Sequence, residues 1–247
     1  MHERTLLFGP PGSGKTRQLV NVIKYLEDLG IPVYAIDLED KMEAMLLGLN
    51  ESPKNLKLYT AFSWEELKTD NNSVFNQIEK QVKPDQWIAI DRVDLSWPLV
   101  QRWYTQQKYN EELATKMLET AKAMKKSSMF IPRFDQGSWQ VINEQYESFM
   151  LSILYRFRCN VIMTSGVKGA DDNAPIDIYA ALGVTPRGQK ELGHQPHSTF
   201  LLFQKKSGRD ITWHISTGKD LPNRVQFDKD ELFDFSLQYL GLYYPGK

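Results

Sequence analysis

Apolar positions up to residue 165 follow two alternating spacings. Short, continuous apolar runs are typical of buried strands, and they predict strands over residues 4–8, 32–39, 56–59, 87–91 and 160–165. Between these runs, apolar residues recur every three or four positions, which predicts helices over residues 16–26, 40–49, 74–82, 111–126 and 138–157. Ser63 and Glu66 form a capping-box pattern that predicts a further short helix. This alternation is typical of an α/β fold, in which helices flank both faces of a mainly parallel sheet.

The end of the chain has a different pattern. Two apolar runs at residues 198–204 and 211–216 are joined by a turn at residues 207–210, which predicts an antiparallel C-terminal hairpin. A final amphipathic helix is predicted over residues 228–240.

Two longer regions do not fit simple strand–helix alternation. Residues 166–195 show no sustained periodicity apart from one turn of helix at residues 176–182, so we expect a mobile, functional loop there. Residues 95–157 are longer than a crossover between two strands requires. We interpret them as a helical insertion within a single domain that spans residues 1–247.

Composition narrows the class of protein. Hydrophobic residues make up 41% and charged residues 25% of the 247 residues, which are ordinary values for a globular protein. The formal net charge is −1, so any nucleic-acid-binding face has to be local. The single cysteine, Cys159, excludes an internal disulfide and fits a reducing compartment. Without a signal peptide or an apolar run long enough to span a bilayer, we expect a cytoplasmic protein with no membrane partner.

One motif near the start of the sequence carries specific chemistry. Residues 9–16 fit the phosphate-binding pattern G-x-x-x-x-G-K-[ST] and lie between a predicted strand and a predicted helix, as this motif requires. Its glycines allow a tight turn whose N–H groups converge on phosphate oxygens, and the helix N-terminus adds a favourable dipole. We predict that Lys15 contacts the β- and γ-phosphates and that the Thr16 hydroxyl binds Mg²⁺. The predicted nucleotide-binding residues are Gly9, Pro10, Pro11, Gly12, Ser13, Gly14, Lys15, Thr16 and Arg17.

A carboxylate for the same ion is predicted at the end of another strand. Asp91 follows an apolar run and looks like the Walker B acid that holds Mg²⁺ beside a P-loop, although an aspartate can also simply end a strand. In a parallel sheet with right-handed crossovers, the carboxyl ends of the strands lie at one edge. We therefore expect Gly9, Glu39, Asp91 and Ser165 to lie close together at that edge.

The run Ile36-Asp37-Leu38-Glu39 extends the likeness beyond the P-loop. It resembles the Ile-Asp-x-Glu pattern of the RecA-like ATPases, and this resemblance implies a RecA-like core with Glu39 as the general base for the attacking water. The alternative is a surface acid that favours the start of the next helix. The resemblance also implies a γ-phosphate sensor at the end of residues 160–165, which would be Ser165 or Thr164. A hydroxyl that only satisfies the strand end is the alternative there.

The resemblance also assigns a role to residues 166–195. They occupy the position of the mobile DNA-binding loop of RecA-like recombinases, which implies that phosphates contact Lys168, Arg187 and Lys190. The same segment also carries acidic residues that argue against such contacts, namely Asp171, Asp172 and Asp177.

The terminal hairpin is the other region to which the resemblance assigns a role. RecA-like oligomers often supply a Lys or Arg from this region to the γ-phosphate of a neighbouring subunit, which implies Lys219 or Arg224 here. A solvated, charged hairpin is the alternative. This part of the resemblance implies a homo-oligomer with ATP sites between subunits.

The resemblance favours one function and leaves others open. It is strongest to phage-encoded RecA-like proteins that work with a single-strand-binding or annealing protein, which implies ATP- and Mg²⁺-dependent action on single-stranded DNA in recombination or replication, in the host cytoplasm. A DNA-translocating motor, such as a packaging ATPase or helicase, would have the same site. A small-molecule kinase or a nucleotide switch is a further alternative, although the sequence has no arginine-rich lid pattern and no Asn-Lys-x-Asp motif. Aromatic residues that could stack on bases, although core packing is their commoner use, are Trp97, Trp103, Tyr104, Phe134 and Trp139.

Overall fold

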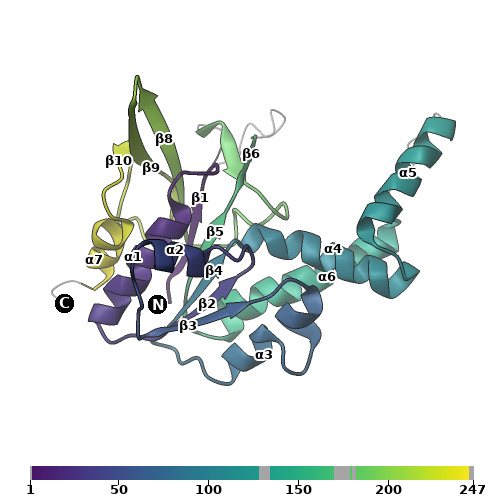
Figure 1. The fold of residues 1–247 in the computed structure, drawn as a ribbon, viewed down its shortest axis with the longest axis horizontal. Coiled ribbons are helices and arrows are strands. Elements are labelled where there is room, and N and C mark those ends of the chain that lie inside the picture. Colours follow the sequence, from purple (N-terminus) through teal and green to yellow (C-terminus); the bar gives the residue numbers. More distant parts are fainter. Residues whose placement is uncertain (1, 128–133, 170–178, 180–181, 245–247) are drawn as a thin grey trace.

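The computed structural model describes residues 2–127, 134–169, 179 and 182–244, and its centre is an eight-stranded, mainly parallel sheet (Figure 1). The strand order is β10-β9-β8-β1-β5-β4-β2-β3. The strands from β8 to β3 are parallel, whereas β9 runs antiparallel to both β8 and β10. The predicted α/β fold and its antiparallel hairpin are thus confirmed. The strands are β1 (Arg4–Phe8), β2 (Val33–Asp37), β3 (Leu56–Thr60), β4 (Trp87–Asp91), β5 (Asn160–Ser165), β8 (Ser198–Ser207), β9 (Asp210–Asp220) and β10 (Asp230–Glu231).

Helices cover both faces of the sheet, each face over its own apolar cluster. Successive side chains of a strand point to opposite faces, so Leu6 of β1 joins one cluster and Leu7 the other. Because both faces are buried, the central strands form the continuous apolar runs seen in the sequence. The Leu7 face carries α1 (Lys15–Asp28), α2 (Met42–Gly48), the π-helical turn Ser236–Leu240 and α7 (Gly241–Tyr243). The Leu6 face carries the π-helical turns Glu65–Thr69 and Ser152–Arg156, α3 (Val74–Glu79), the 3₁₀ turn Val93–Leu95, α4 (Ser96–Tyr109) and α6 (Gln136–Leu151).

A helical arm fills most of residues 95–157. Helices α4 and α6 pack beside each other, and α5 (Leu113–Ser127) extends away from the sheet (Figure 1). Sequence periodicity does not predict α4, although Pro98 in its first turn is compatible with a helix start, where a missing N–H costs little.

The aromatic residues considered for base stacking pack into the interior of this arm. Trp97 stacks on Trp139 with 6.3 Å between ring centroids, and Phe134 meets Trp139 edge-on at 5.0 Å. Tyr104 is buried, and Trp103 packs against the same cluster. The buried rings of Tyr104 and Phe134 therefore follow the commoner alternative of core packing, whereas Trp97, Trp103 and Trp139 are half-buried.

One prediction for the second half of the chain is wrong. Residues 228–240 do not form one helix, because β10 pairs with β9 and a π-helical turn begins only at Ser236. Within residues 166–195, β6 (Val167–Gly169) and β7 (Val184–Pro186) form an antiparallel pair that the apolar pattern does not predict. Strands of two or three residues are too short to give a readable apolar pattern. The helical turn predicted at residues 176–182 lies largely outside the described residues.

No helix within the described ranges is long and apolar enough to cross a bilayer.

Candidate active site

A pocket opens at the carboxyl edge of the sheet, where β1, β5, β4 and β2 lie side by side. The register pairs Phe8 with Ser165 and Asp37 with Asp91, so these neighbouring strands end at the same level. The residues that follow the strands therefore meet at one place, as the sequence predicts. The pocket is lined by much of the P-loop, by Glu39 and Arg92, and by Gly166, Val167 and Arg187.

The P-loop connects β1 to α1 through backbone geometry that depends on glycine. Gly12 and Gly14 have φ angles of 78° and 90°, in the left-handed region that side chains disfavour. A Cβ atom on Gly9 would lie 2.1 Å from the carbonyl oxygen of Leu202 in β8. The motif glycines therefore serve both the turn and the close packing of the loop against β8.

The terminal hairpin holds the P-loop from the side of β8. Gln204 Nε2 and Trp213 Nε1 both donate to the carbonyl oxygen of Gly12, at 2.6 and 3.3 Å. These two residues are not predicted from the sequence, because nothing in the hairpin pattern indicates which side chains reach a loop about two hundred residues earlier. The hairpin thus contributes directly to the shape of the nucleotide site.

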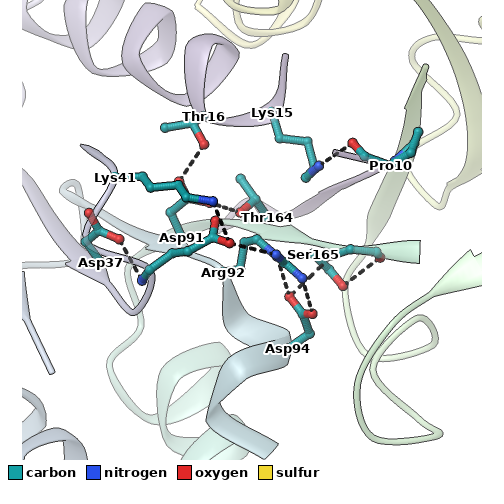
Figure 2. A network of polar contacts seen from close by, with 12 residues as sticks. Pro10, Lys15, Thr16, Asp37, Lys41, Asp91, Arg92, Asp94, Thr164 and Ser165 are labelled. Atoms are coloured by element: carbon teal, nitrogen blue, oxygen red, sulfur yellow. Dashed lines mark hydrogen bonds and ion pairs between the residues drawn. The ribbon is translucent and has the colours of Figure 1, made fainter. Parts of the chain in front are cut away.

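The Lys15 ammonium bonds back to the P-loop backbone (Figure 2). Its Nζ donates to the carbonyl oxygens of Gly9 and Pro10 at 2.8 and 2.9 Å. Burial, together with the nearby positive charge of Arg92, lowers the pKa of Lys15 to about 8. A bound phosphate would place negative charge directly beside this buried cation and so favour its ammonium form.

Asp91 lies between two threonine hydroxyls (Figure 2). Thr16 Oγ1 donates to Asp91 Oδ2 at 2.7 Å, and Thr164 Oγ1 donates to Asp91 Oδ1. Burial raises the pKa of Asp91, although both hydrogen bonds favour the ionised form. A hydroxyl and a carboxylate oxygen side by side form a donor set that suits Mg²⁺. In the described part of the chain, no group of three or more His, Cys, Asp or Glu side chains could hold a metal, so Mg²⁺ here would need further ligands from substrate phosphates and water.

Glu39 extends into the pocket from the loop after β2. Asp37 accepts the backbone N–H groups of Glu39 and Met42 at 2.9 and 2.7 Å, and so fixes the turn that presents Glu39. The Glu39 Oε1 atom forms ion pairs with Lys41 Nζ and Arg92 Nη1, each at 2.9 Å. Burial alone would raise the pKa of Glu39, but the hydrogen bonds and charges of Lys41 and Arg92 outweigh it and lower that pKa. Glu39 is therefore an ionised carboxylate beside the P-loop.

Arg92 lines the pocket although no sequence motif singles it out. Its guanidinium contacts Asp94 twice, Nε to Oδ1 at 3.1 Å and Nη2 to Oδ2 at 2.8 Å, and contacts Glu39 through Nη1 (Figure 2). The sequence does carry a signal for it, because Arg92 and Asp94 stand within three residues after the predicted metal ligand at the end of β4. Charged residues just beyond a strand's carboxyl end lie at the ligand-binding edge of such a sheet.

The two candidate γ-phosphate sensors are both engaged elsewhere. Thr164 is bonded to Asp91, and the buried Ser165 hydroxyl lies 3.0 and 2.8 Å from the carbonyl oxygens of Gly166 and Arg187. This arrangement favours the alternative that these hydroxyls stabilise the strand end and orient Asp91.

The predicted nucleic-acid contacts lie in different surroundings. Lys168 on β6, Arg187 and Lys190 are all exposed, and Arg187 also lines the nucleotide pocket. Asp171, Asp172 and Asp177 lie outside the described residues.

The candidate finger residues both have partners within their own chain. Lys219 Nζ donates to the His194 carbonyl at 2.8 Å. Arg224 Nη2 forms an ion pair at 2.7 Å with the buried Glu3, which precedes β1 and so lies at the end of that strand opposite the P-loop. This pairing argues against the finger role implied for Arg224 and indicates a structural role.

Comparisons with known proteins agree with this geometry. A family model described as "ATPase family associated with various cellular activities (AAA)" matches residues 5–160, more than half of the chain. No curated protein sequence is significantly similar to the chain. Among solved structures, the KaiC-like protein PH0186 from the hyperthermophilic archaeon Pyrococcus horikoshii OT3 has a TM-score of 0.51 with 11% sequence identity, covering 92% of this chain and 82% of that chain. At that identity the similarity concerns the fold.

Proposed function

Because this chain belongs to the AAA family of ATPases, we propose that its ATP hydrolysis depends on Mg²⁺ and drives action on single-stranded DNA in recombination or replication by a homo-oligomer. One observation carries the catalytic part of the proposal. Lys15, Thr16 and the ionised Glu39 line a single pocket at the carboxyl edge of the sheet, and Asp91 bonds to Thr16 directly behind that lining.

Each of these residues has a distinct task in the proposed reaction. The P-loop N–H groups and the Lys15 ammonium bind the β- and γ-phosphates and stabilise the charge that develops during transfer. Thr16 and Asp91 would hold Mg²⁺, which when bound neutralises phosphate charge and orients the γ-phosphate. Glu39 orients a water molecule for in-line attack on the γ-phosphorus and accepts its proton, leaving ADP and inorganic phosphate.

The nucleic-acid part of the proposal depends on the segment that follows β5. Lys168 and Lys190 expose their ammonium groups on this segment, and Arg187 of the same segment lines the nucleotide pocket. Exposed cations near the site could bind phosphates of a DNA strand at a place that responds to the nucleotide. A chain with a net charge of −1 would need such a local surface.

The catalytic proposal is tested by measuring ATP hydrolysis and nucleotide binding together. Glu39→Gln should lower the hydrolysis rate by about 10²- to 10⁴-fold while ATP still binds. Lys15→Ala should instead lose ATP binding. If Glu39→Gln hydrolyses ATP at the wild-type rate, the assignment of the general base is wrong.

The DNA proposal needs a separate measurement. Labelled single-stranded DNA should bind in the presence of ATP with an affinity that falls as salt rises, and the double variant Lys168→Ala/Lys190→Ala should bind more weakly. Absence of binding at low salt with any nucleotide would overturn this part. Translocation on duplex DNA would favour a motor, and rapid phosphorylation of a small acceptor without DNA would favour a kinase.

A further inference from the structure

The contacts of Glu39 leave one of its two carboxylate oxygens available. Lys41 and Arg92 both bind Oε1, and within the described part of the chain no hydrogen bond reaches Oε2. The Lys41 side chain is 62% exposed, whereas that of Arg92 is 17% exposed. A partly buried guanidinium restricts a carboxylate more than a solvated ammonium does, because it is planar and its N–H donors have fixed directions. Arg92 is therefore the contact that fixes the direction of the free oxygen.

Arg92 is itself fixed by two hydrogen bonds to the carboxylate of Asp94. The two-point contact described above orients the guanidinium plane and leaves Nη1 directed at Glu39. The Asp94 side chain is only 1% exposed, and its Oδ1 also accepts the backbone N–H of Gly166 at 3.3 Å. A buried carboxylate with three donors has little freedom to move.

Asp94 also connects this arrangement to β6 and β7. Gly166 immediately precedes β6, and the Gly188 that follows β7 packs against Asp94, since a Cβ on Gly188 would lie 3.4 Å from Asp94 Cβ. A Cβ on Gly166 would lie 2.8 Å from Arg92 Nη2 and 3.4 Å from Asp94 Oδ2. The residues that flank the β6–β7 pair, Gly166 and Gly188, therefore lie against Asp94, and Gly166 also lies against Arg92.

We propose that Arg92 is the positioning residue for Glu39. The β6–β7 pair then controls the rate of ATP hydrolysis, because Asp94 and Gly166 fix the position of the Arg92 side chain. The inference depends on the proposed role of Glu39 as the general base. Any ligand that shifts the β6–β7 pair changes the hydrolysis rate without touching the nucleotide. The physical basis is geometric, because a displacement of about 1 Å in a catalytic group can cost on the order of 10²-fold in rate.

Two glycines of the same segment provide a matched pair of variants. Gly166→Ala places a methyl group against the end of the Arg92 side chain. Because a side-chain end moves more easily than the backbone, this methyl group should displace Arg92 without disrupting the fold. Gly169→Ala, in β6, meets no atom of the described residues within 4 Å, and neither glycine has a positive φ. In the full-length chain, Gly166→Ala should lower the single-turnover rate of ATP hydrolysis by about 10- to 100-fold with ATP affinity within about twofold of wild type. Gly169→Ala should match wild type in both quantities.

Substitution of Arg92 itself gives a second, independent readout. Arg92→Ala should reduce the single-turnover rate by a similar factor, and added guanidinium ions should restore part of it, whereas they should not restore Glu39→Gln. Recovery by a free cation separates loss of positioning from general unfolding. Wild-type hydrolysis in Arg92→Ala, or equal rates in the two glycine variants, would overturn the inference.

The outcomes also separate this inference from the function on which it depends. If Glu39→Gln retains the wild-type rate, the assignment of the base fails and the inference fails with it. If Glu39→Gln is inactive while Arg92→Ala and Gly166→Ala remain fully active, only the inference fails.

Discussion

Raising the pH from about 7 to about 9 should weaken ATP binding, because Lys15 in the free protein loses its proton over this range. Burial and the charge of Arg92 lower the pKa of Lys15 from 10.5 to about 8. Bound phosphates favour the ammonium form and raise that pKa again. At a pH above the lowered pKa of Lys15, ATP can bind in the same way only if Lys15 takes up a proton. The apparent affinity for ATP therefore falls as the pH rises.

The size of the effect follows from the distance between the pH and the pKa. At about pH 9, roughly one free molecule in ten carries a charged Lys15, which corresponds to an approximately tenfold rise in Kd, or ~1.4 kcal/mol. At about pH 7 most molecules are already charged, so the affinity there is near its maximum. A lysine with an ordinary pKa would change Kd by less than about a tenth over the same range.

Calorimetric titration with a non-hydrolysable ATP analogue can test this directly. Titrations near pH 9 in two buffers with different heats of ionisation should reveal uptake of close to one proton, and uptake should nearly vanish near pH 7. Lys15→Arg is the matched control, because a guanidinium stays charged throughout and any remaining binding should not depend on pH in this way. A Kd that is constant up to about pH 9, or an equal rise in Lys15→Arg, would refute the reasoning.

Three substitutions test other parts of the structure. Asp91→Asn should raise the free energy of unfolding by roughly 1 kcal/mol, since it removes a fully buried charge. The same variant should lose Mg²⁺-dependent hydrolysis. A melting temperature below that of the wild type would contradict the predicted gain in stability. Arg224→Met should cost about 3 kcal/mol in denaturant unfolding by leaving the buried Glu3 unpaired, and unchanged stability with lost hydrolysis would instead favour the finger role. Gly9→Ala should lower stability by about 2 kcal/mol and weaken ATP binding, because its Cβ would meet the Leu202 carbonyl oxygen, and wild-type melting would exclude that clash.

The sequence by itself determines the parts of this protein that depend on local pattern. Strands β1, β4 and β5 begin and end at the predicted residues, because runs buried on both faces are continuously apolar and end abruptly. The P-loop follows from spacing alone, since glycine, lysine and threonine must stand at fixed positions to surround a phosphate. The meeting of Glu39 and Asp91 follows from the rule that parallel strands end at one edge.

Only the tertiary structure decides how these groups act on one another. The lowered pKa of Lys15, the two-carboxylate environment of Arg92, and the partners of Arg224 all depend on burial and on distances between residues far apart in the sequence. Short elements such as β6 and β10 form because a neighbouring strand or loop supplies their hydrogen bonds, so their own residues carry no readable pattern. Electrostatic and hydrogen-bonding energies are set by separation and solvent exposure, and the fold fixes both only once distant segments have packed together.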